Sequence, residues 1–391
     1  MQQMANAQLC GINTLLDDQY SGNDTLLTGN LGLALYYYNL YKSTRKPGDK
    51  GKAEQLINDV FSHINQDTPT LSGASLSSGA AGLGYLLNEI TRDGLIDLDV
   101  TDEIGELDQY LCDSAEKLIQ EDNFDYLHGA TGIVNYFVER AKVRNERSPY
   151  LDLLVDKICT CVEEEECGYW FSGCVEGTSR QKVVNFSLSH GLCGILLVLI
   201  NAYPYSIHKE KLEKTVMNVI QFILKHKMDV EFSRNQYSFF PFFAIQGATE
   251  ISAPNRLGWC YGDLNEVLLF YRAGKWLGDK NLINLADLIG MQSVMRKSQE
   301  ATLVNGASFC HGSAGLAQFY RTLYRERPLD AYKDGYEYWM DKTVQLLEED
   351  RERNAYVGKE HEVMEGLVGV GLTLLSYVSD QDLKWSKLFL L

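Results

Sequence analysis

Two kinds of hydrophobic pattern alternate along the chain. In one, two glycines three residues apart open a nearly continuous apolar run, as in the segment that begins at Gly191 (GLCGILLVLI). In the other, apolar residues recur at i, i+3, i+4 and i+7 with charges opposite, as in 211–226 (KLEKTVMNVIQFILKH). A helix that is apolar on all sides has to be buried, whereas an amphipathic helix covers it from outside. The alternation therefore predicts pairs of one inner and one outer helix.

The glycine-led segment occurs seven times, so the pair of helices is a repeat. The other copies begin at Gly29, Gly79, Gly129, Gly312, Gly366 and, in a degenerate form with Asn265 in place of the second glycine, at Gly262. Successive copies are 50, 50, 62, 71, 50 and 54 residues apart. Further amphipathic stretches between the copies are 53–64, 104–119 and 335–349.

Repeated helix pairs either stack into an open solenoid or close into a ring. The terminal copies carry no extra polar face of the kind that caps a solenoid, and this favours closure. We therefore predict an all-α protein, an α/α toroid of seven inner and seven outer helices that forms one domain over residues 1–391.

The repeat places chemically active side chains in equivalent loops. Counted back from the first glycine of each copy, Cys260 and Cys310 stand two residues before it, His190 and His311 one before it, and Asp125 four before it. In a closed ring, equivalent loops lie at the same end, so we expect these side chains to meet at one mouth of the toroid. An open solenoid would spread them apart.

Cys260, Cys310 and His311 form a candidate metal site. Two thiolates and one imidazole suit Zn²⁺, which prefers sulfur and nitrogen ligands in tetrahedral geometry. Three protein ligands leave the fourth position open, which is the pattern of catalytic rather than structural zinc. The alternative is a pair of buried, inert thiols beside a turn histidine.

Composition narrows the possible partners and the compartment. The formal net charge of -17 argues against binding to nucleic acid or to anionic membranes, because both require a basic surface. The start of the chain lacks the pattern of a signal peptide, and the longest apolar run, Gly194 to Ile200, is too short to span a bilayer. We therefore expect a cytoplasmic protein whose nine cysteines are reduced.

Three short motifs resemble those of the lanthionine synthetase C-like family. They are Trp259-Cys260-Tyr261-Gly262 and Cys310-His311-Gly312, which match the two zinc motifs of the family, and Ser189-His190-Gly191, which matches its third signature. Arg256 and Asp125 also fall where the family places functional residues. The resemblance covers essentially all of residues 25–380. The sequence departs from the family pattern at Asn265, where the family usually has glycine.

The resemblance implies a zinc-dependent lanthipeptide cyclase. Such enzymes add the thiol of a peptide cysteine to dehydroalanine or dehydrobutyrine, a Michael addition that forms the thioether ring of lanthionine or methyllanthionine. A free thiol has a pKa of about 8.5, and coordination to zinc deprotonates it. Attack of the thiolate on the β-carbon leaves an enolate, which must be protonated at Cα. His190 is the candidate acid/base, since imidazole titrates near neutral pH.

The roles of Asp125 and Arg256 rest on the resemblance. Arg256 could stabilise the negative charge of the enolate or orient Asp125. Asp125 could position an acid/base group or the substrate. A structural ion pair between the two residues is the alternative. The expected partners are a dehydrated precursor peptide and a separate dehydratase, because the seven repeats leave no segment for a dehydratase domain. Contact with a membrane is expected only through a biosynthetic complex.

Other functions remain open at this point. A non-catalytic member of the family would bind zinc and a thiol such as glutathione or a peptide, although the presence of both His190 and Arg256 favours catalysis. A carbohydrate-active α/α toroid would need two opposed carboxylates, and only Asp125 can be placed. A terpenoid or prenyl-transferring toroid would use a different metal set or a DDxxD cluster, and the sequence contains no DDxxD.

Several remaining features have a structural and a functional interpretation. The segment 228–258 either lines a peptide groove with its aromatic residues or packs as an ordinary loop. His128 shares the register of His190 but is expected to pack or cap, and Cys193 is expected in the core. Four crowded cysteines could hold a second metal ion, although their spacing is not typical of zinc sites; they are Cys159, Cys161, Cys167 and Cys174.

Overall fold

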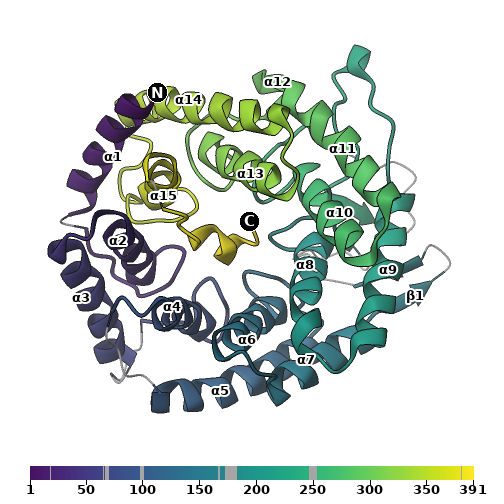
Figure 1. Cartoon of the computed structure of the whole chain (residues 1–391), viewed down its shortest axis with the longest axis horizontal. Coiled ribbons are helices and arrows are strands. Elements are labelled where there is room, and N and C mark those ends of the chain that lie inside the picture. The colour runs from purple at the N-terminus through teal and green to yellow at the C-terminus, as the bar shows by residue number, and fades with distance from the viewer. Residues whose placement is uncertain are drawn as a thin grey trace. The chain divides into compact units, whose positions relative to one another are not determined.

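The computed structural model consists almost entirely of helices (Figure 1). It describes residues 1–17, 19–64, 66, 70–96, 101–165, 168–171, 183–245, 253–379 and 381–391. The strands in this part of the chain form two short antiparallel pairs. β1 (Glu163–Glu165) pairs with β2 (Gly168–Trp170), and β3 (Val183–Asn185) pairs with β4 (Phe243–Ile245). The predicted all-α class is therefore confirmed.

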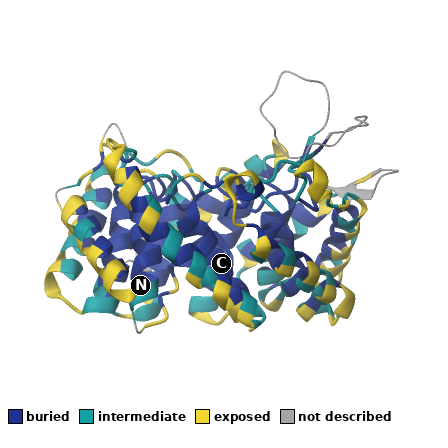
Figure 2. Ribbon diagram, turned by 90° about the horizontal axis from the view of Figure 1, so that it is seen from above, coloured by how far each residue is buried: buried dark blue, intermediate teal, exposed yellow. Residues whose placement is uncertain are grey.

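Every glycine-led segment forms a helix. In chain order these helices are α2 (Asn30–Thr44), α4 (Ala80–Asp93), α6 (Ala130–Arg144), α8 (Leu192–Ala202), α10 (Leu264–Leu277), α13 (Ser313–Glu326) and α15 (Leu367–Val378). Their side chains are buried over most of each helix, as the continuous apolar runs predict. Figure 2 shows these buried residues in the interior of the molecule.

The amphipathic stretches form a second set of helices. They are α1 (Gln2–Leu16), α3 (Pro47–Ile64), α5 (Thr101–Gln120), α7 (Pro149–Thr160), α9 (Lys209–Lys225), α11 (Lys280–Met295) and α14 (Asp330–Glu352). Each has a buried stripe and an opposite exposed face wherever its side chains are described. The exposed face of α11 also carries the apolar side chains of Leu288, Met291 and Met295. Within the described residues, the prediction of seven buried and seven covering helices is confirmed. The remaining short helices are α12 (Gln299–Thr302), η1 (Tyr203–Tyr205), η2 (Phe232–Arg234) and η3 (Trp385–Phe389).

The chain folds into two compact units. The first contains residues 1–73, 77–100 and 304–391, and the second contains 74–76 and 101–303. In the first unit, α2 packs on α3, α13 on α14 and α1 on α15 (Figure 1). In the second unit, α10 packs on α11, α5 on α6, and α8 lies beside α6 and α10. Each unit thus pairs buried with amphipathic helices, and the predicted single domain stays a prediction.

The second glycine of the repeat lies where the backbone turns back on itself. A Cβ atom on Gly315 would lie 1.9 Å from the carbonyl oxygen of Phe309, and one on Gly194 would lie 2.2 Å from that of Leu188. The equivalent glycine of three other copies has the same close contact. No other residue fits such a position without moving the backbone. These glycines therefore let each loop pass tightly over the start of its helix.

The degenerate copy replaces this contact with hydrogen bonds. The Asn265 side chain donates to the carbonyl of Trp259 (3.1 Å) and accepts from the backbone N–H of Leu188 (2.9 Å). Gly262, the first glycine of this copy, keeps a close backbone approach: a Cβ there would lie 2.2 Å from the carbonyl oxygen of Arg256. Its φ of 120° also places it in the region that favours glycine. The departure at Asn265 therefore changes the local turn while it ties the loop before α10 to the loop before α8.

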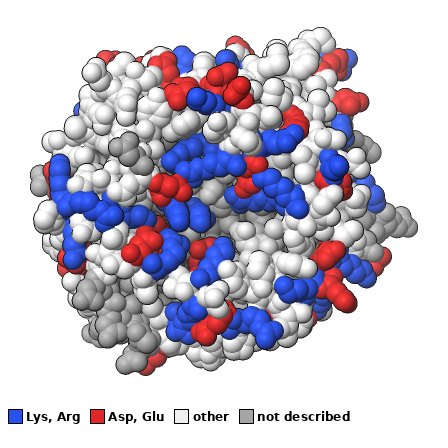
Figure 3. Space-filling model, in the orientation of Figure 1, with Lys and Arg blue, Asp and Glu red and all other residues white. Residues whose placement is uncertain are grey.

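Charge is unevenly distributed over the surface. The face drawn in Figure 3 displays many Lys and Arg side chains among the acidic ones, although the chain carries a formal net charge of -17. Among the described helices, none combines the length and the apolar character needed to cross a membrane.

Candidate functional site

The loops before the buried helices of the second unit share one turn. The side chain of Asn123 accepts from the N–H of Asp125 (3.3 Å), and Oδ1 of Asp125 accepts from the N–H groups of Leu127 (2.7 Å) and His128 (2.8 Å). One repeat later, Oγ of Ser187 accepts from the N–H of His190 (3.0 Å) in the same way. Asp125 therefore occupies a position where a short polar side chain builds the turn.

The second carboxylate oxygen of Asp125 contacts His190. Nδ1 of His190 donates to Oδ2 of Asp125 across 2.6 Å. Burial alone would lower the pKa of His190, but the hydrogen bond and charge of Asp125, together with the charge of Cys260, raise it above the usual value of 6.5. The other ring nitrogen, Nε2, is the one left to exchange a proton. Half-buried and oriented in this way, His190 has the features of an acid/base group.

Other rings surround His190. The ring of His128 is stacked on it at 5.8 Å, and the ring of Tyr261 lies at 6.4 Å. The Tyr261 hydroxyl accepts from Nδ2 of Asn185 (2.9 Å). His128 is exposed, and its backbone is held by Asp125, which fits the expected packing and capping more simply than a second catalytic role.

The aromatic residues of 228–258 divide into two groups. Phe239 and Phe240 are buried, as ordinary loop packing requires. Phe242 and Phe243 are half-buried, and their rings lie 4.7 and 5.8 Å from that of Tyr261. The described part of the segment therefore contributes both to packing and to the surroundings of Tyr261. Residues 246–252 lie outside the described part of the chain.

A buried ion pair anchors this segment to the start of α10. Asp263 accepts from the N–H groups of Phe239 (2.9 Å) and Phe240 (3.1 Å) and from Arg296 (2.9 Å). Burial raises the pKa of Asp263, although Arg296 and the two backbone donors act to lower it. Arg296 also donates to the carbonyl of Asn255 (2.6 Å). The loop that leads to Arg256 and Cys260 is thereby fixed at both ends.

Cys260 and Arg256 lie in this loop. Cys260 is buried, and its carbonyl accepts from the Ser189 hydroxyl (3.3 Å), next to His190. The guanidinium of Arg256 is half-buried and has neither an ion pair nor a hydrogen bond with any residue that the structure describes. Asp125 pairs with His190 instead, so the described residues contain no structural ion pair between Asp125 and Arg256.

The first unit holds Cys310 and His311. The N–H groups of Phe309 (3.1 Å) and Cys310 (3.0 Å) donate to the carbonyl of Met364, which ties the loop before α13 to the loop before α15. Nδ1 of His311 lies 3.2 Å from Oε1 of Glu365. His311 is thus oriented by a carboxylate, an arrangement that is common for histidines that bind metals.

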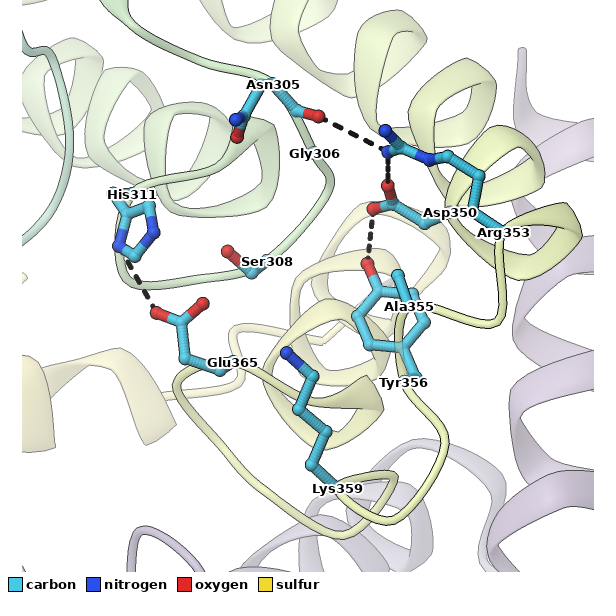
Figure 4. Close-up of a pocket in the computed structure, with 10 residues that line it drawn as sticks. All are labelled: Asn305, Gly306, Ser308, His311, Asp350, Arg353, Ala355, Tyr356, Lys359 and Glu365. Atoms are coloured by element: carbon cyan, nitrogen blue, oxygen red, sulfur yellow. Dashed lines mark hydrogen bonds and ion pairs between the residues drawn. The ribbon is translucent and has the colours of Figure 1, made fainter.

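A pocket of about 330 Å³ opens beside His311 within the first unit (Figure 4). Three groups of residues line it. Asn305, Gly306, Ser308 and His311 come from the loop before α13, Asp350 and Arg353 from the end of α14, and Ala355, Tyr356, Lys359 and Glu365 from the loop before α15. His311 and Glu365 form one side of this pocket, and the Asp350–Arg353–Tyr356 cluster forms another.

Cys260, Cys310 and His311 together offer a donor set that suits zinc. Both cysteines are free thiols, and His311 supplies an imidazole. Two sulfur ligands and one nitrogen ligand match the preference of Zn²⁺ and leave a fourth position for a substrate thiol. The chemistry of these residues therefore fits the predicted metal, which stays a prediction.

The other cysteines do not add a second site within the described residues. Cys193 is fully buried, as expected for a core residue. Burial also raises the pKa of Cys159 to about 11, so its thiol is protonated at neutral pH. Cys161 is half-buried beside it in sequence, whereas Cys167 and Cys174 lie outside the described residues.

Two residues beside the predicted site were not assigned a role from the sequence. They are Tyr261, next to His190, and Glu365, next to His311. Both stand one residue before the first glycine of their copies, the register position that His190 and His311 also occupy. Applying the same count to all seven copies would have identified both of them.

Comparison with known proteins adds two findings. A family model described as "Lanthionine synthetase C-like protein" matches residues 20–390. The structure is similar to that of nisin cyclase, with a TM-score of 0.77 over 99% of this chain and 96% of that chain, at 19% identity. That likeness shows the fold, and it confirms the predicted α/α toroid as the fold class. No curated protein matches the sequence.

Proposed function

Because this chain belongs to the lanthionine synthetase C-like family, we propose that it is a zinc-dependent lanthipeptide cyclase. It would join the thiol of a peptide cysteine to the β-carbon of dehydroalanine or dehydrobutyrine. The observation that carries the proposal is the hydrogen bond between His190 and Asp125, which orients an imidazole with a raised pKa. A protein that only bound zinc and a thiol would not need this proton carrier.

Cys260, Cys310 and His311 are the residues proposed to hold zinc. Their support is the chemistry of the donor set and their shared position in the repeat. When bound, zinc supplies a Lewis acid that lowers the pKa of a thiol at its open position. The orientation of His311 by Glu365 fits this role.

His190 is proposed to move the proton. The thiol loses a proton, the sulfur forms a bond to Cβ, and the electron pair of the Cα–Cβ double bond moves towards the carbonyl as an enolate. A proton then returns to Cα, so the product is an isomer of the substrate. One group that accepts the first proton and delivers the second satisfies this balance, and Nε2 of His190 is available for it.

Asp125 and Arg256 are proposed to support this step. Asp125 fixes the tautomer of His190 and stabilises its protonated form, which is the role of a carboxylate in a catalytic triad. The guanidinium of Arg256, which has no described partner, offers a donor for the negative charge of the enolate. The proposed partners are a dehydrated precursor peptide and a separate dehydratase that produces it.

The proposed function is tested with a synthetic peptide that contains one cysteine and one dehydroalanine. Ring closure is followed by thiol alkylation, because an uncyclised cysteine takes up the label and a thioether does not. Zinc-loaded protein should remove the alkylatable thiol faster than a buffer control, and a chelator should stop it. Zinc-loaded protein that binds the peptide thiol without closing the ring would identify a non-catalytic binding protein instead.

A further inference from the structure

The pocket beside His311 is polar and is built by loops of the first unit. Its lining combines the loop that carries His311, the end of α14 and the loop before α15. Its volume of about 330 Å³ lies at the lower end of the range for pockets that bind small molecules. Its lining residues carry amide, hydroxyl and charged groups, so the pocket can hold a polar ligand (Figure 4).

The deepest charge in this pocket is already satisfied. Asp350 is buried and accepts from the N–H of Ala307 (2.8 Å), from the hydroxyl of Tyr356 (2.7 Å) and from Arg353. Arg353 also donates to the carbonyl of Asn305 (3.4 Å). A cation would find no free acceptor at Asp350, and the positive charge of Arg353 balances its negative charge.

Lys359 is the charged group of the lining that remains available. Figure 4 shows its side chain extending into the pocket between Glu365 and Tyr356. It is half-buried, and its ammonium has no ion pair or hydrogen bond with any described residue. Glu365, which also lines the pocket, contacts His311 instead. A half-buried ammonium in a polar pocket favours an anionic ligand.

We propose that this pocket binds a carboxylate of the thiol substrate, with Lys359 as its counter-ion and Ser308 and Asn305 as neutral donors. The inference rests on the proposed function, because His311, a proposed zinc ligand, forms part of the same wall. A thiol held near His311 then has its carboxylate within the lining. The pocket would select cysteines whose surroundings carry a negative charge.

Two sources can supply this carboxylate. One is an acidic side chain beside the reacting cysteine, and the other is the free C-terminus of a peptide that ends in cysteine. Both present the same group to Lys359, so matched peptides have to separate them. Suitable pairs are acetyl-Cys-Asp-amide against acetyl-Cys-Asn-amide, and acetyl-Ala-Cys with a free carboxylate against its amide.

The test replaces zinc with Co²⁺, whose absorption changes when a thiolate binds. Each peptide is titrated into the cobalt-loaded protein, and the dissociation constants within each pair are compared. We expect the carboxylate form of at least one pair to bind about tenfold more tightly. Lys359→Met should abolish that preference while binding of the neutral peptide is unchanged. Lys342→Met, at a half-buried lysine of α14 outside the pocket lining, is the matched control.

The metal-free protein provides a second measurement that does not depend on cobalt. Titration with acetyl-Cys-Asp-amide and with acetyl-Ala-Cys should shift the backbone amide resonances of Gly306 and Ser308, and Lys359→Met should remove the shift for the peptide that uses the pocket. Equal binding of both members of each pair overturns the carboxylate site, and so does a preference that survives Lys359→Met. Cobalt that binds without any thiolate band contradicts the proposed function. Wild-type protein whose amide resonances do not shift with either peptide contradicts only the pocket.

Discussion

Each unit of the molecule contributes one histidine to the proposed function, each of the two contacts a carboxylate through Nδ1, and the two pairs differ in construction. In the second unit, His190 contacts Asp125 at 2.6 Å, and the other oxygen of that carboxylate is held by two backbone N–H groups. In the first unit, His311 contacts Glu365 at a longer 3.2 Å, and both side chains are more exposed. The first arrangement is rigid, and the second is more open.

The two histidines stand at the same position of the repeat but follow different residues. His190 follows Ser189, whose hydroxyl donates to the carbonyl of Cys260. His311 follows Cys310, whose free thiol is a group that commonly binds zinc. Both histidines stand one residue before the glycine of their repeat. One loop position therefore carries a candidate proton carrier in one unit and a candidate metal ligand in the other, and the residue before the histidine differs between them.

The largest effect is expected where the metal ligands are changed. Cys310→Ala should abolish tight zinc binding, because only two of the three proposed ligands would remain. Elemental analysis of the purified protein should give about one zinc per wild-type chain and nearly none for the variant. Cys10→Ala, which removes an exposed free thiol, should keep its zinc. Full zinc content in Cys310→Ala would refute the ligand set.

His190→Asn should distinguish the role proposed for His190 from that proposed for His311. The variant should keep its zinc and close rings about 10²–10⁴-fold more slowly, because it loses the proposed acid/base group. His311→Asn should lose both zinc and activity. Alkylation of the residual thiol measures the rate. His208→Asn, which removes another histidine whose Nδ1 lies beside a carboxylate (Asp156, 3.6 Å), controls for the loss of such a contact. A wild-type rate in His190→Asn would assign that residue a structural role.

The loop geometry itself is tested by the second glycine of the repeat. Gly194→Ala places a Cβ 2.2 Å from the carbonyl oxygen of Leu188 and should lower the free energy of unfolding by about 1–3 kcal/mol. Urea denaturation measures the change. Gly105→Ala is the matched control, because its position in α5 has open space around it, and alanine should stabilise the helix by up to about 1 kcal/mol. Equal effects would contradict the close contact.

The smallest effect concerns the ion pair that raises the pKa of His190. Asp125→Asn should lower that pKa, which nuclear magnetic resonance can follow through the imidazole signals. A pKa raised by folding contributes stability that is complete below the unfolded value, about 6.5, and is lost as the pH rises through the folded value. Relative to the wild type, the variant should therefore lose more free energy of unfolding at about pH 6 than at about pH 9. A pH-independent loss would show that Asp125 acts only through the turn.

Much of the architecture follows from local pattern. The continuous apolar runs predicted buried helices, and the spaced apolar residues predicted covering ones, because a helix must bury its apolar surface. The count from each glycine also placed Cys260, Cys310, His190 and His311 in equivalent loops. The pairing of Asp125 with His190 was only one of several possibilities, and an ion pair with Arg256 was another. Sequence spacing does not say which side chain crosses from one loop to the next.

The sequence by itself determined the helices, their repeat, the buried or exposed character of each, and the register of the candidate ligands, because these depend on residues close together in the chain. Only the tertiary structure decided which groups meet. It paired His190 with Asp125, gave Glu365 to His311, left the guanidinium of Arg256 without a described partner, and left Lys359 in a polar pocket. Those outcomes depend on how loops from different repeats approach one another, and that approach is set by packing of the buried helices rather than by any local signal.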